Sequence, residues 1–324
     1  MTATFRSRLG RRLAAFIALK KALGRRFFSE TYVLAHLDRF LATRRLAALT
    51  PAAFAAWTMT FLHTSPTTRR ARMLVVRKFC IYLRRTDPKC FVPDSRGFPS
   101  RLPHRPPHIF TREQIADLIH AATRLPTRST SLIRGEVFRL AIVLLYTAGL
   151  RRNELVHLTM SDYDAKEKTL LIRASKFHKS RVVALSPTAV AEMDRYLAAR
   201  HRFAHQPDAP LLINNRGGRA GYSGEGVGGA IRQLFRELGI RTADGRCPRA
   251  HDLRHTYAVH ALLRWYHDGA DVQAKLPILS TAMGHVSIAS TAHYLALLEP
   301  LAAAASGRFE RHCRALFTTR GEKR

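Results

Sequence analysis

The first 95 residues carry apolar side chains at helical spacing, with polar residues between them. The pattern predicts four helices, which cover residues 5–26 and then begin at Ser29 as an N-cap, at Pro51 and at Pro66. A hydroxyl residue stands directly before each of the two prolines, as is typical of a helix N-terminus. The sequence therefore predicts an all-helical N-terminal domain.

Proline and basic residues interrupt this pattern between Pro88 and Pro107. A run of this composition is typical of an extended linker, because proline removes a backbone donor and cannot sit inside a helix. We therefore divide the chain into a helical domain at 1–95, a linker at 96–108 and a second domain at 109–324, whose last residues form a C-terminal tail.

The second domain begins with strong helix signals. Thr111 is a predicted N-cap, and Gln114 stands where a capping box places its third residue. An apolar helix that ends at Gly149 follows, and Arg151 heads the next helix. Glu154 lies three residues further on, so its side chain is predicted to share a helix face with Arg151.

One stretch of the second domain changes from helical to alternating periodicity. Residues 168–185 alternate apolar and polar side chains in two runs, which predicts a β-hairpin with its turn at 176–179. Helices are predicted again at 188–202 and 230–238. The glycine-rich loop between them lacks the Gly-Lys-Ser/Thr ending of a phosphate-binding loop, so we expect a surface turn. The expected fold class is mainly α with a small β-sheet (α+β).

The charge of the chain is strongly positive. Its 324 residues hold 54 Lys and Arg against 23 Asp and Glu, which gives a formal net charge of +31. Residues 1–105 alone hold 22 Lys and Arg against 4 Asp and Glu. A basic excess that is spread over both domains indicates a polyanionic partner, and we predict double-stranded DNA.

The helix that begins at Pro66 carries a dense group of basic side chains. Few acidic residues lie near them in the sequence, and a basic helix can lie against a phosphate backbone. A solvated helix face is the alternative. The predicted DNA-contacting residues are Arg69, Arg70, Arg72, Arg77 and Lys78.

The sequence gives little support for a membrane span, a transit peptide, a disulfide or a metal site. No run of about 18 apolar residues is present, so we expect no membrane span. The basic N-terminus could mimic a transit peptide, but its apolar residues fall mostly on one helix face. The four cysteines lack metal-ligand spacing and are predicted to be reduced thiols of a cytoplasmic protein. There is also no acidic cluster of the kind that holds Mg²⁺, so we expect neither metal nor cofactor.

Candidate chemistry lies in signals that follow one another along the second domain, namely Arg151, Lys176, the pair His251 and Arg254, His285 and Tyr294. An arginine fork beside a histidine suits a phosphate oxygen, because a guanidinium can donate two parallel hydrogen bonds. A tyrosine with its ordinary pKa near 10 needs a proton acceptor and a positive field before it can attack at neutral pH. For the helix that carries His251 and Arg254, solvated basic residues are the alternative.

Four motifs carry a resemblance to a known family. TAGLRRNEL at 147–155, SKFHKSR at 175–181, HDLRH at 251–255 and MGHVSIASTAHY at 283–294 resemble the catalytic domain of the tyrosine recombinase (phage integrase) family. The N-terminal domain resembles the family's core-binding domain in length, charge and helix content. The N-terminal region and the KFHKSR hairpin are also similar to the integrases of multi-recombinase mobile elements.

The resemblance implies a site-specific DNA recombinase or integrase. Such an enzyme cuts and rejoins DNA through a 3′-phosphotyrosine intermediate, without metal or ATP, in DNA integration and transposition. It implies a homotetramer on paired sites, alone or with related recombinases, acting in the cytoplasm on the nucleoid. The C-terminal tail, including a helix to about Phe317, would then dock on a neighbouring protomer.

The resemblance also implies a role for each matched residue. Tyr294 would attack the scissile phosphate, Arg151 and Arg254 would clamp its non-bridging oxygens, and Lys176 would protonate the departing 5′ oxygen. The remaining matched residues are histidines and one glutamate.

Among them, His251 would exchange a proton with the tyrosine oxygen, and His285 would hydrogen-bond the phosphate. Glu154 and His255 would hold supporting positions. Two other readings remain, a catalytically silent DNA-binding protein of the same fold and a type IB topoisomerase-like activity.

Three neighbours of these motifs have separate expectations. Arg152 competes with Arg151 for the catalytic position, which directly follows Gly-Leu in the family. Tyr257 is expected to be a packing residue, and Arg181 to be a DNA-backbone contact or a solvated charge.

Overall fold

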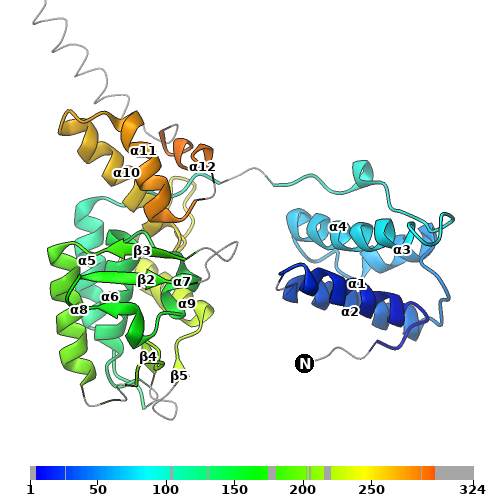
Figure 1. The fold of residues 1–324 in the computed structure, drawn as a ribbon, viewed down its shortest axis with the longest axis horizontal. Coiled ribbons are helices and arrows are strands. Elements are labelled where there is room, and N and C mark those ends of the chain that lie inside the picture. Colours follow the sequence, from blue (N-terminus) through cyan, green and yellow to red (C-terminus); the bar gives the residue numbers. More distant parts are fainter. Residues whose placement is uncertain are drawn as a thin grey trace, which may run out of the picture. The chain divides into compact units, whose positions relative to one another are not determined.

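The computed structural model describes residues 5–25, 27–102, 105–129, 131–173, 180–201, 203, 206–214, 220–285 and 287–295. The chain divides into two compact units, Met1–Arg105 and Pro106–Arg324 (Figure 1). Each unit has its own hydrophobic core. The predicted linker therefore spans the division between them.

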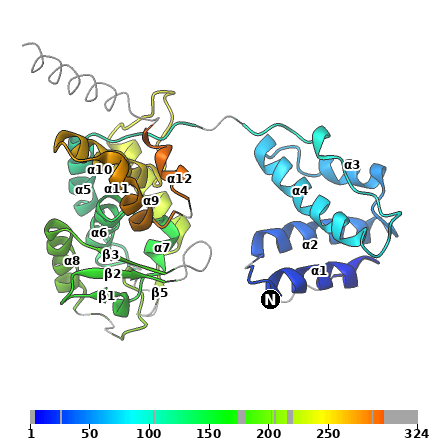
Figure 2. The same cartoon turned by 45° about the horizontal axis from the view of Figure 1, so that its top comes forward.

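The N-terminal unit consists of helices α1 (Gly10–Ala22), α2 (Phe28–Thr43), α3 (Pro51–Met59) and α4 (Pro66–Leu83), followed by the 3-10 turn η1 (Ser95–Gly97). Figure 2 shows the same four helices from a second direction. Thr50 and Ser65 cap α3 and α4 as predicted, since their side chains accept from the backbone N–H of Ala53 and Thr68.

Two sequence predictions in this unit are wrong. Ser29 does not cap α2, because the helix already begins at Phe28 and the cap position is Phe27, which has a left-handed backbone with φ of 50°. The extended linker does not begin at residue 96. Phe98 packs into the core around Trp57, where its ring lies 6.0 Å from that of Phe54. Aromatic burial therefore holds this part of the proline-rich segment on the unit.

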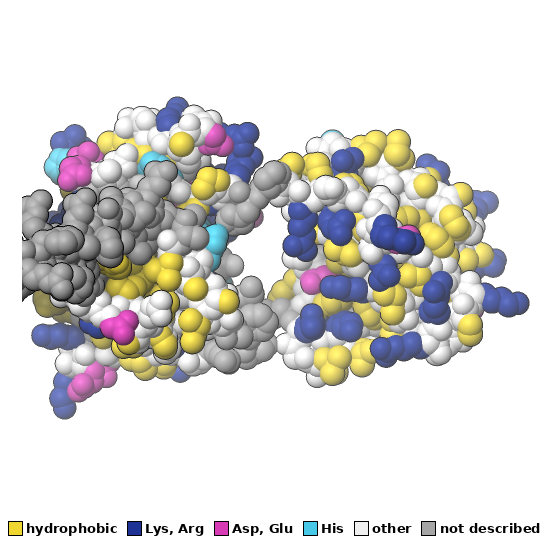
Figure 3. Space-filling model, turned by 90° about the horizontal axis from the view of Figure 1, so that it is seen from above, with side chains coloured by type: hydrophobic (Ala, Val, Ile, Leu, Met, Phe, Trp, Pro, Cys, Tyr) yellow, Lys and Arg dark blue, Asp and Glu magenta, His cyan; other side chains and the backbone are white. Residues whose placement is uncertain are grey.

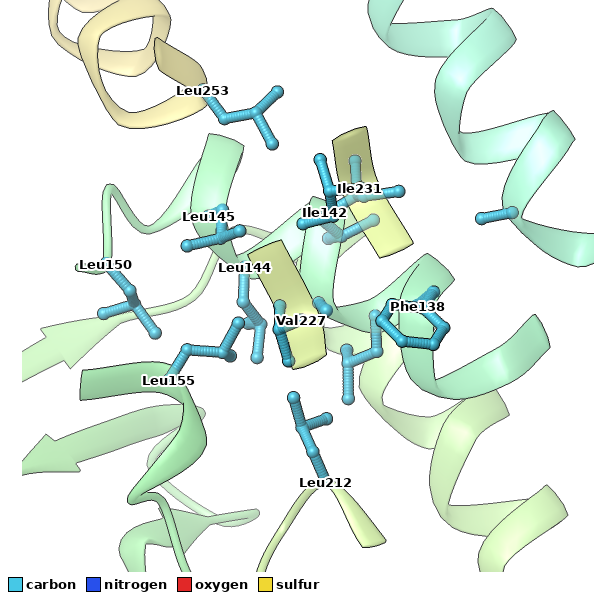
Figure 4. Close-up of a cluster of buried hydrophobic side chains, with 14 of the residues drawn as sticks. Phe138, Ile142, Leu144, Leu145, Leu150, Leu155, Leu212, Val227, Ile231 and Leu253 are labelled. Carbon is cyan, nitrogen blue, oxygen red and sulfur yellow. The ribbon is translucent and has the colours of Figure 1, made fainter. Parts of the chain in front are cut away.

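The C-terminal unit is built around α6 (Arg134–Thr147), with ten of its fourteen residues buried. Figure 4 shows its side chains, among them Phe138 and Ile142, meeting Val227 and Ile231 of α9 (Gly224–Glu237). Both cartoon views place α10 (Asp252–His267) beside α11 (Val272–Met283). The other helices are α5 (Arg112–Thr123), α7 (Arg152–Val156), η2 (Met160–Asp162), α8 (Pro187–Arg200) and α12 (Ala289–Ala292).

Strands occupy a small part of this unit. β1 (Tyr163–Asp164), β2 (Thr169–Ile172) and β3 (Arg181–Ala184) form an antiparallel sheet in that order. β2 and β3 pair from Thr169 with Ala184 to Ile172 with Arg181, so the predicted hairpin is confirmed. Its turn, with Lys176, lies outside the described residues. The fold is mainly α with small sheets, as predicted.

The glycine-rich segment differs from its prediction. β4 (Ile213–Asn214) pairs with β5 (Ala220–Gly221), and α9 begins at Gly224, six residues before the predicted start. Ser223 caps the helix by accepting from the N–H of Gly226. The glycines have a packing reason, because a Cβ at Gly228 would lie 2.7 Å from Nη1 of Arg152. Close approach of that side chain favours a residue without a Cβ at position 228.

Candidate active site

The turn between α6 and α7 presents Arg151. Gly149 has a left-handed backbone with φ of 58°, and a Cβ there would lie 2.4 Å from Cδ1 of Tyr257 on α10. Only glycine fits this contact without movement of the ring. Tyr257 is therefore a packing residue, as predicted, and it fixes the turn that places Arg151 at the N-cap of α7.

A buried carboxylate orients Arg151. Glu154 accepts from Nη1 of Arg151 at 2.6 Å and from its backbone N–H at 2.9 Å. The same carboxylate accepts two hydrogen bonds from Arg181, at 3.0 and 2.8 Å. Burial by itself would raise the pKa of Glu154, but the hydrogen bonds from Arg181 and Arg151 outweigh it and hold the pKa at about 2.

Arg181 is the residue whose role the sequence prediction missed. Its side chain is only 8% exposed, and Nε also donates to the carbonyl of Ala282 at 2.8 Å. It is therefore not a solvated charge. The alternation of β3 carried a signal for this, because residue 181 shares a strand face with the buried Val183.

Arg254 joins three parts of the unit. It lies on α10, is 1% exposed, and donates from Nη1 to the carbonyl of Gly149 and from Nη2 to that of Met283 at 2.5 Å. Burial, followed by the positive charge of Arg151, lowers the pKa of Arg254 to about 10, so it stays cationic at neutral pH. A guanidinium has five N–H donors, and these contacts leave others for a substrate oxygen.

The end of α11 brings His285 to the same place. Gly284 ends the helix with φ of 64°, and its carbonyl accepts from Nη2 of Arg151 at 2.7 Å. Nδ1 of His285 lies 2.8 Å from Oγ1 of Thr291. Burial, together with the charges of Arg254 and Arg151, lowers the pKa of His285 to about 4. The imidazole is therefore neutral at neutral pH and can act as a hydrogen-bond donor.

Tyr294 lies inside this group and is 3% exposed. Its hydroxyl is 3.0 Å from Nδ1 of His255, and its ring stacks on that of His285 at 6.2 Å between centroids. Burial raises the pKa of Tyr294, while the charges of Arg254 and Arg151 act in the opposite direction. The phenol thus has a hydrogen-bond partner and a positive field in the same chain.

Two histidines stand near the phenol in an order that differs from the prediction. The ring within hydrogen-bonding distance of Tyr294 is His255, whereas His251 contacts the edge of His255 at 4.8 Å between centroids. His251 lies at the N-cap of α10, where partial loss of hydration and the charge of Arg254 lower its pKa. His255, and not the predicted His251, is therefore the histidine within hydrogen-bonding distance of the Tyr294 hydroxyl.

The structure places the remaining predicted residues as follows. The side chain of Arg152 turns toward Gly224 and Gly228, so Arg151 alone of the pair joins the network. In the N-terminal unit, Nη1 of Arg70 donates to the carbonyls of Phe98 and Pro99, and Arg72 lies over the ring of Phe61. Arg69, Arg77 and Lys78 complete the predicted DNA-contacting residues, which stay a prediction.

Figure 3 shows Lys and Arg side chains spread over the visible face of the N-terminal unit, on the right, with few acidic side chains among them. Within the described ranges, no group of three or more His, Cys, Asp or Glu is placed to hold a metal ion. Over the same ranges, every helix is too short or too polar to cross a membrane.

Comparisons with known proteins agree with this geometry. The model of the phage integrase family matches residues 108–299. The chain is 32% identical over 299 residues to a Sinorhizobium fredii protein named as integrase/recombinase y4rB, covering 91% of this chain and 95% of that protein. It is 26% identical over 196 residues to tyrosine recombinase XerA of Pyrococcus horikoshii, covering 60% and 58%.

A solved structure shares the fold. The Tn1549 transposon integrase, in complex with transposon right end DNA, superposes with a TM-score of 0.63 and covers 93% of this chain and 98% of that one. The two are 16% identical, so this likeness shows the fold alone.

Proposed function

The chain belongs to the phage integrase family, the tyrosine recombinases, and on that premise we propose how its residues carry out site-specific DNA recombination. The observation that carries the proposal is the burial of Tyr294 beside His255, in the field of Arg151 and Arg254. These groups come from α7, α10 and the segment after α11, and the fold brings them to one place.

Tyr294 is the proposed nucleophile. A scissile DNA phosphate enters beside the phenol, and N–H donors of Arg151 and Arg254 bind its non-bridging oxygens. Because negative charge gathers on those oxygens in the transition state, preorganised cations there lower the barrier. Glu154 and Arg181 hold Arg151 so that little reorganisation is needed when the charge develops.

The proposed proton transfers, and one hydrogen bond to the phosphate, involve histidines and one lysine. When Nδ1 of His255 is unprotonated it can accept the phenol proton as the oxygen attacks phosphorus, with His251 contacting its ring. Neutral His285 can donate a hydrogen bond to the phosphate. We propose Lys176 as the acid that protonates the leaving 5′ oxygen.

The products are a 3′-phosphotyrosyl bond and a free 5′ hydroxyl. A phosphodiester has been exchanged for another phosphodiester, so the same residues can run the step backwards with a 5′ hydroxyl from a second DNA. The reaction as written needs neither ATP nor a metal ion. We further propose that two DNA sites are joined by a homotetramer, with or without related recombinases.

A nicked suicide substrate tests the proposal. When the short strand beside the scissile phosphate diffuses away, an active enzyme stays covalently bound to DNA. We expect wild type and Tyr163→Phe, a tyrosine of β1, to form the adduct on denaturing gels, and Tyr294→Phe to form none. A wild-type protein that binds this DNA but forms no adduct would instead be the silent DNA-binding protein.

A second measurement separates recombination from topoisomerase activity. Plasmids with one or two copies of the site are incubated with the enzyme. Recombinant products from the two-site plasmid alone support the proposal. Relaxation of supercoils on either plasmid, without recombinants, would contradict it.

A further inference from the structure

A second polar site lies at the far end of α6 from the candidate active site. A pocket of about 330 Å³ is lined by residues that include Arg128, Ser131, Arg134, Phe138, Tyr222 and Gln233. Arg134 is the first residue of α6, and Arg151 follows its last turn, so a helix roughly 20 Å long separates the two sites. We call this the Arg134 pocket.

The guanidinium of Arg134 is buried and forms no ion pair among the described residues, although the charge of Glu237 raises its pKa from longer range. The residue is 5% exposed, and Nη1 of its side chain has no hydrogen-bond partner among the described residues. Its Cζ lies 5.5 Å from the ring centroid of Phe138, which offsets only part of the lost hydration. Proteins keep buried charges paired because an unpaired one is costly, so this guanidinium favours an anion as its partner.

The other groups around the Arg134 pocket favour an anion too. Arg128 adds a second cation to the pocket. Burial of Arg134 is the larger cause that lowers its pKa, and the positive charge of Arg128 lowers it further. The hydroxyls of Ser131 and Tyr222 are hydrogen-bonded to each other at the pocket wall. No Asp or Glu lines the pocket.

Two helix N-termini strengthen the positive potential. α6 begins at Arg134, and α9 begins beside Ser223 and Gly226, which line the same pocket. Both helices have 14 residues, and the N-terminal end of a helix attracts anions through its unpaired N–H groups. The acids of these helices, Glu136, Glu225 and Glu237, are not among the residues of the pocket.

We propose that the Arg134 pocket binds a phosphate group. The forks of Arg128 and Arg134 match phosphate oxygens, and the hydroxyls of Ser131 and Tyr222 can serve the remaining oxygens. The pocket volume is at the low end of small-molecule sites, which are roughly 300–1,000 Å³. The phosphate belongs either to the DNA backbone or to a free anion, and the experiment separates these sources.

The first experiment titrates the full chain with inorganic phosphate by calorimetry, in chloride buffer of constant ionic strength. We expect a binding component that survives Arg254→Gln, which removes the catalytic clamp, and also survives Arg195→Gln, an exposed arginine of α8. The same component should weaken at least ten-fold in Arg128→Gln and in Arg134→Met. Equal binding by all four variants would overturn the proposal.

Thermal unfolding gives an independent readout. At phosphate concentrations ten times the Kd, wild type should gain about 3–6 °C in Tm, since ligand binding to the folded state adds to its stability. Without phosphate, Arg134→Met should unfold at or above the wild-type Tm, because it removes an unpaired buried charge. A variant that is equally destabilised with and without phosphate would make Arg134 structural. If Arg134→Met fails to fold, the exposed Arg128→Gln carries the test.

DNA affinity then identifies the source of the phosphate. If it belongs to DNA, Arg128→Gln should weaken binding to all sequences and lower the slope of log K against log salt by about 1. If it belongs to a free anion, that variant should bind DNA as wild type does while losing the phosphate response. Loss of neither property contradicts the proposal. The inference does not rest on recombination, because phosphate binding is measured without strand cleavage.

Discussion

At the scale of single residues, one carboxylate orients two arginine side chains in the candidate active site. Glu154 accepts hydrogen bonds from both Arg151 and Arg181, so each guanidinium is oriented before a substrate arrives. Two flexible arginine side chains would lose conformational entropy during the reaction. Here the same entropy has already been lost during folding. The geometry therefore separates the residues that we propose to bind the phosphate from Arg181, which positions Arg151 through Glu154.

Replacement of Arg181 tests this separation. We expect Arg181→Lys to slow covalent adduct formation about 10–100-fold, because a lysine cannot hold both oxygens of Glu154 and the carbonyl of Ala282. DNA affinity, measured by anisotropy, should change little. The control is Arg173→Gln, an exposed hairpin arginine paired with Asp162. Equal loss of affinity and rate in Arg181→Lys would assign Arg181 to DNA binding.

The pKa of Glu154 predicts a pH dependence of stability. It is about 2 in the folded protein, below the ordinary 4.5, so the ionised form stabilises the fold above pH 4.5. That contribution, on the order of 3 kcal/mol, should be lost as pH falls from 4.5 toward 2. Urea unfolding between pH 3 and 6 should show a steeper loss in wild type than in Glu154→Gln.

The exposed carboxyl of Glu167, in the turn before β2, supplies the control for this series, and Glu167→Gln should follow the wild-type curve. Identical pH slopes for wild type and Glu154→Gln would show that this carboxylate is not the group that titrates.

Helix ends, at the scale of elements, decide where the site residues stand. The turn at Gly149 needs both a left-handed backbone and space for the ring of Tyr257. We expect Gly149→Ala to lower the free energy of unfolding by about 2–5 kcal/mol, from backbone strain and overpacking together. Gly245→Ala isolates the strain, since Gly245 has φ of 74° and open space around its Cα.

In urea unfolding, Gly245→Ala should cost about 1–2 kcal/mol. A loss in Gly149→Ala no larger than this would mean that the ring of Tyr257 moves aside easily, and the turn would then be less rigid than its geometry indicates.

Local chemistry predicted most of the elements. Hydroxyl caps at Thr50, Ser65 and Thr111 marked helix starts because a cap acts within three residues. The start of α9 was missed, since its glycines have low helix propensity. Two of them, Gly224 and Gly228, lie against the side chain of Arg152, a residue some seventy positions earlier in the chain. Such long-range packing is absent from local patterns.

Individual residues of the candidate site could be predicted from the sequence, but the arrangement of their side chains in space could not. Motif order identified Arg151, Arg254, His285 and Tyr294, and the fold brings them together. Tyr294 is within hydrogen-bonding distance of His255, and His251 contacts the ring of His255 instead. Spacing along the chain does not decide between the two histidines, because residues four apart share a helix face.

At the scale of the whole molecule, positive charge is a property of both units, each with its own core. Long-range attraction to DNA therefore does not depend on one segment. The residues of the candidate active site, in contrast, belong to the C-terminal unit. Lys176, the remaining predicted catalytic residue, lies outside the described part of the hairpin, so its role stays a prediction.

The phenol of Tyr294 is packed away between His255 and His285. Cells are crowded with phosphodiesters that could be nicked by mistake, in RNA and in the wrong stretches of the chromosome. Because Tyr294 is 3% exposed, a backbone that meets the enzyme by chance does not reach the hydroxyl oxygen. Strand cleavage away from the target site is therefore disfavoured in this form.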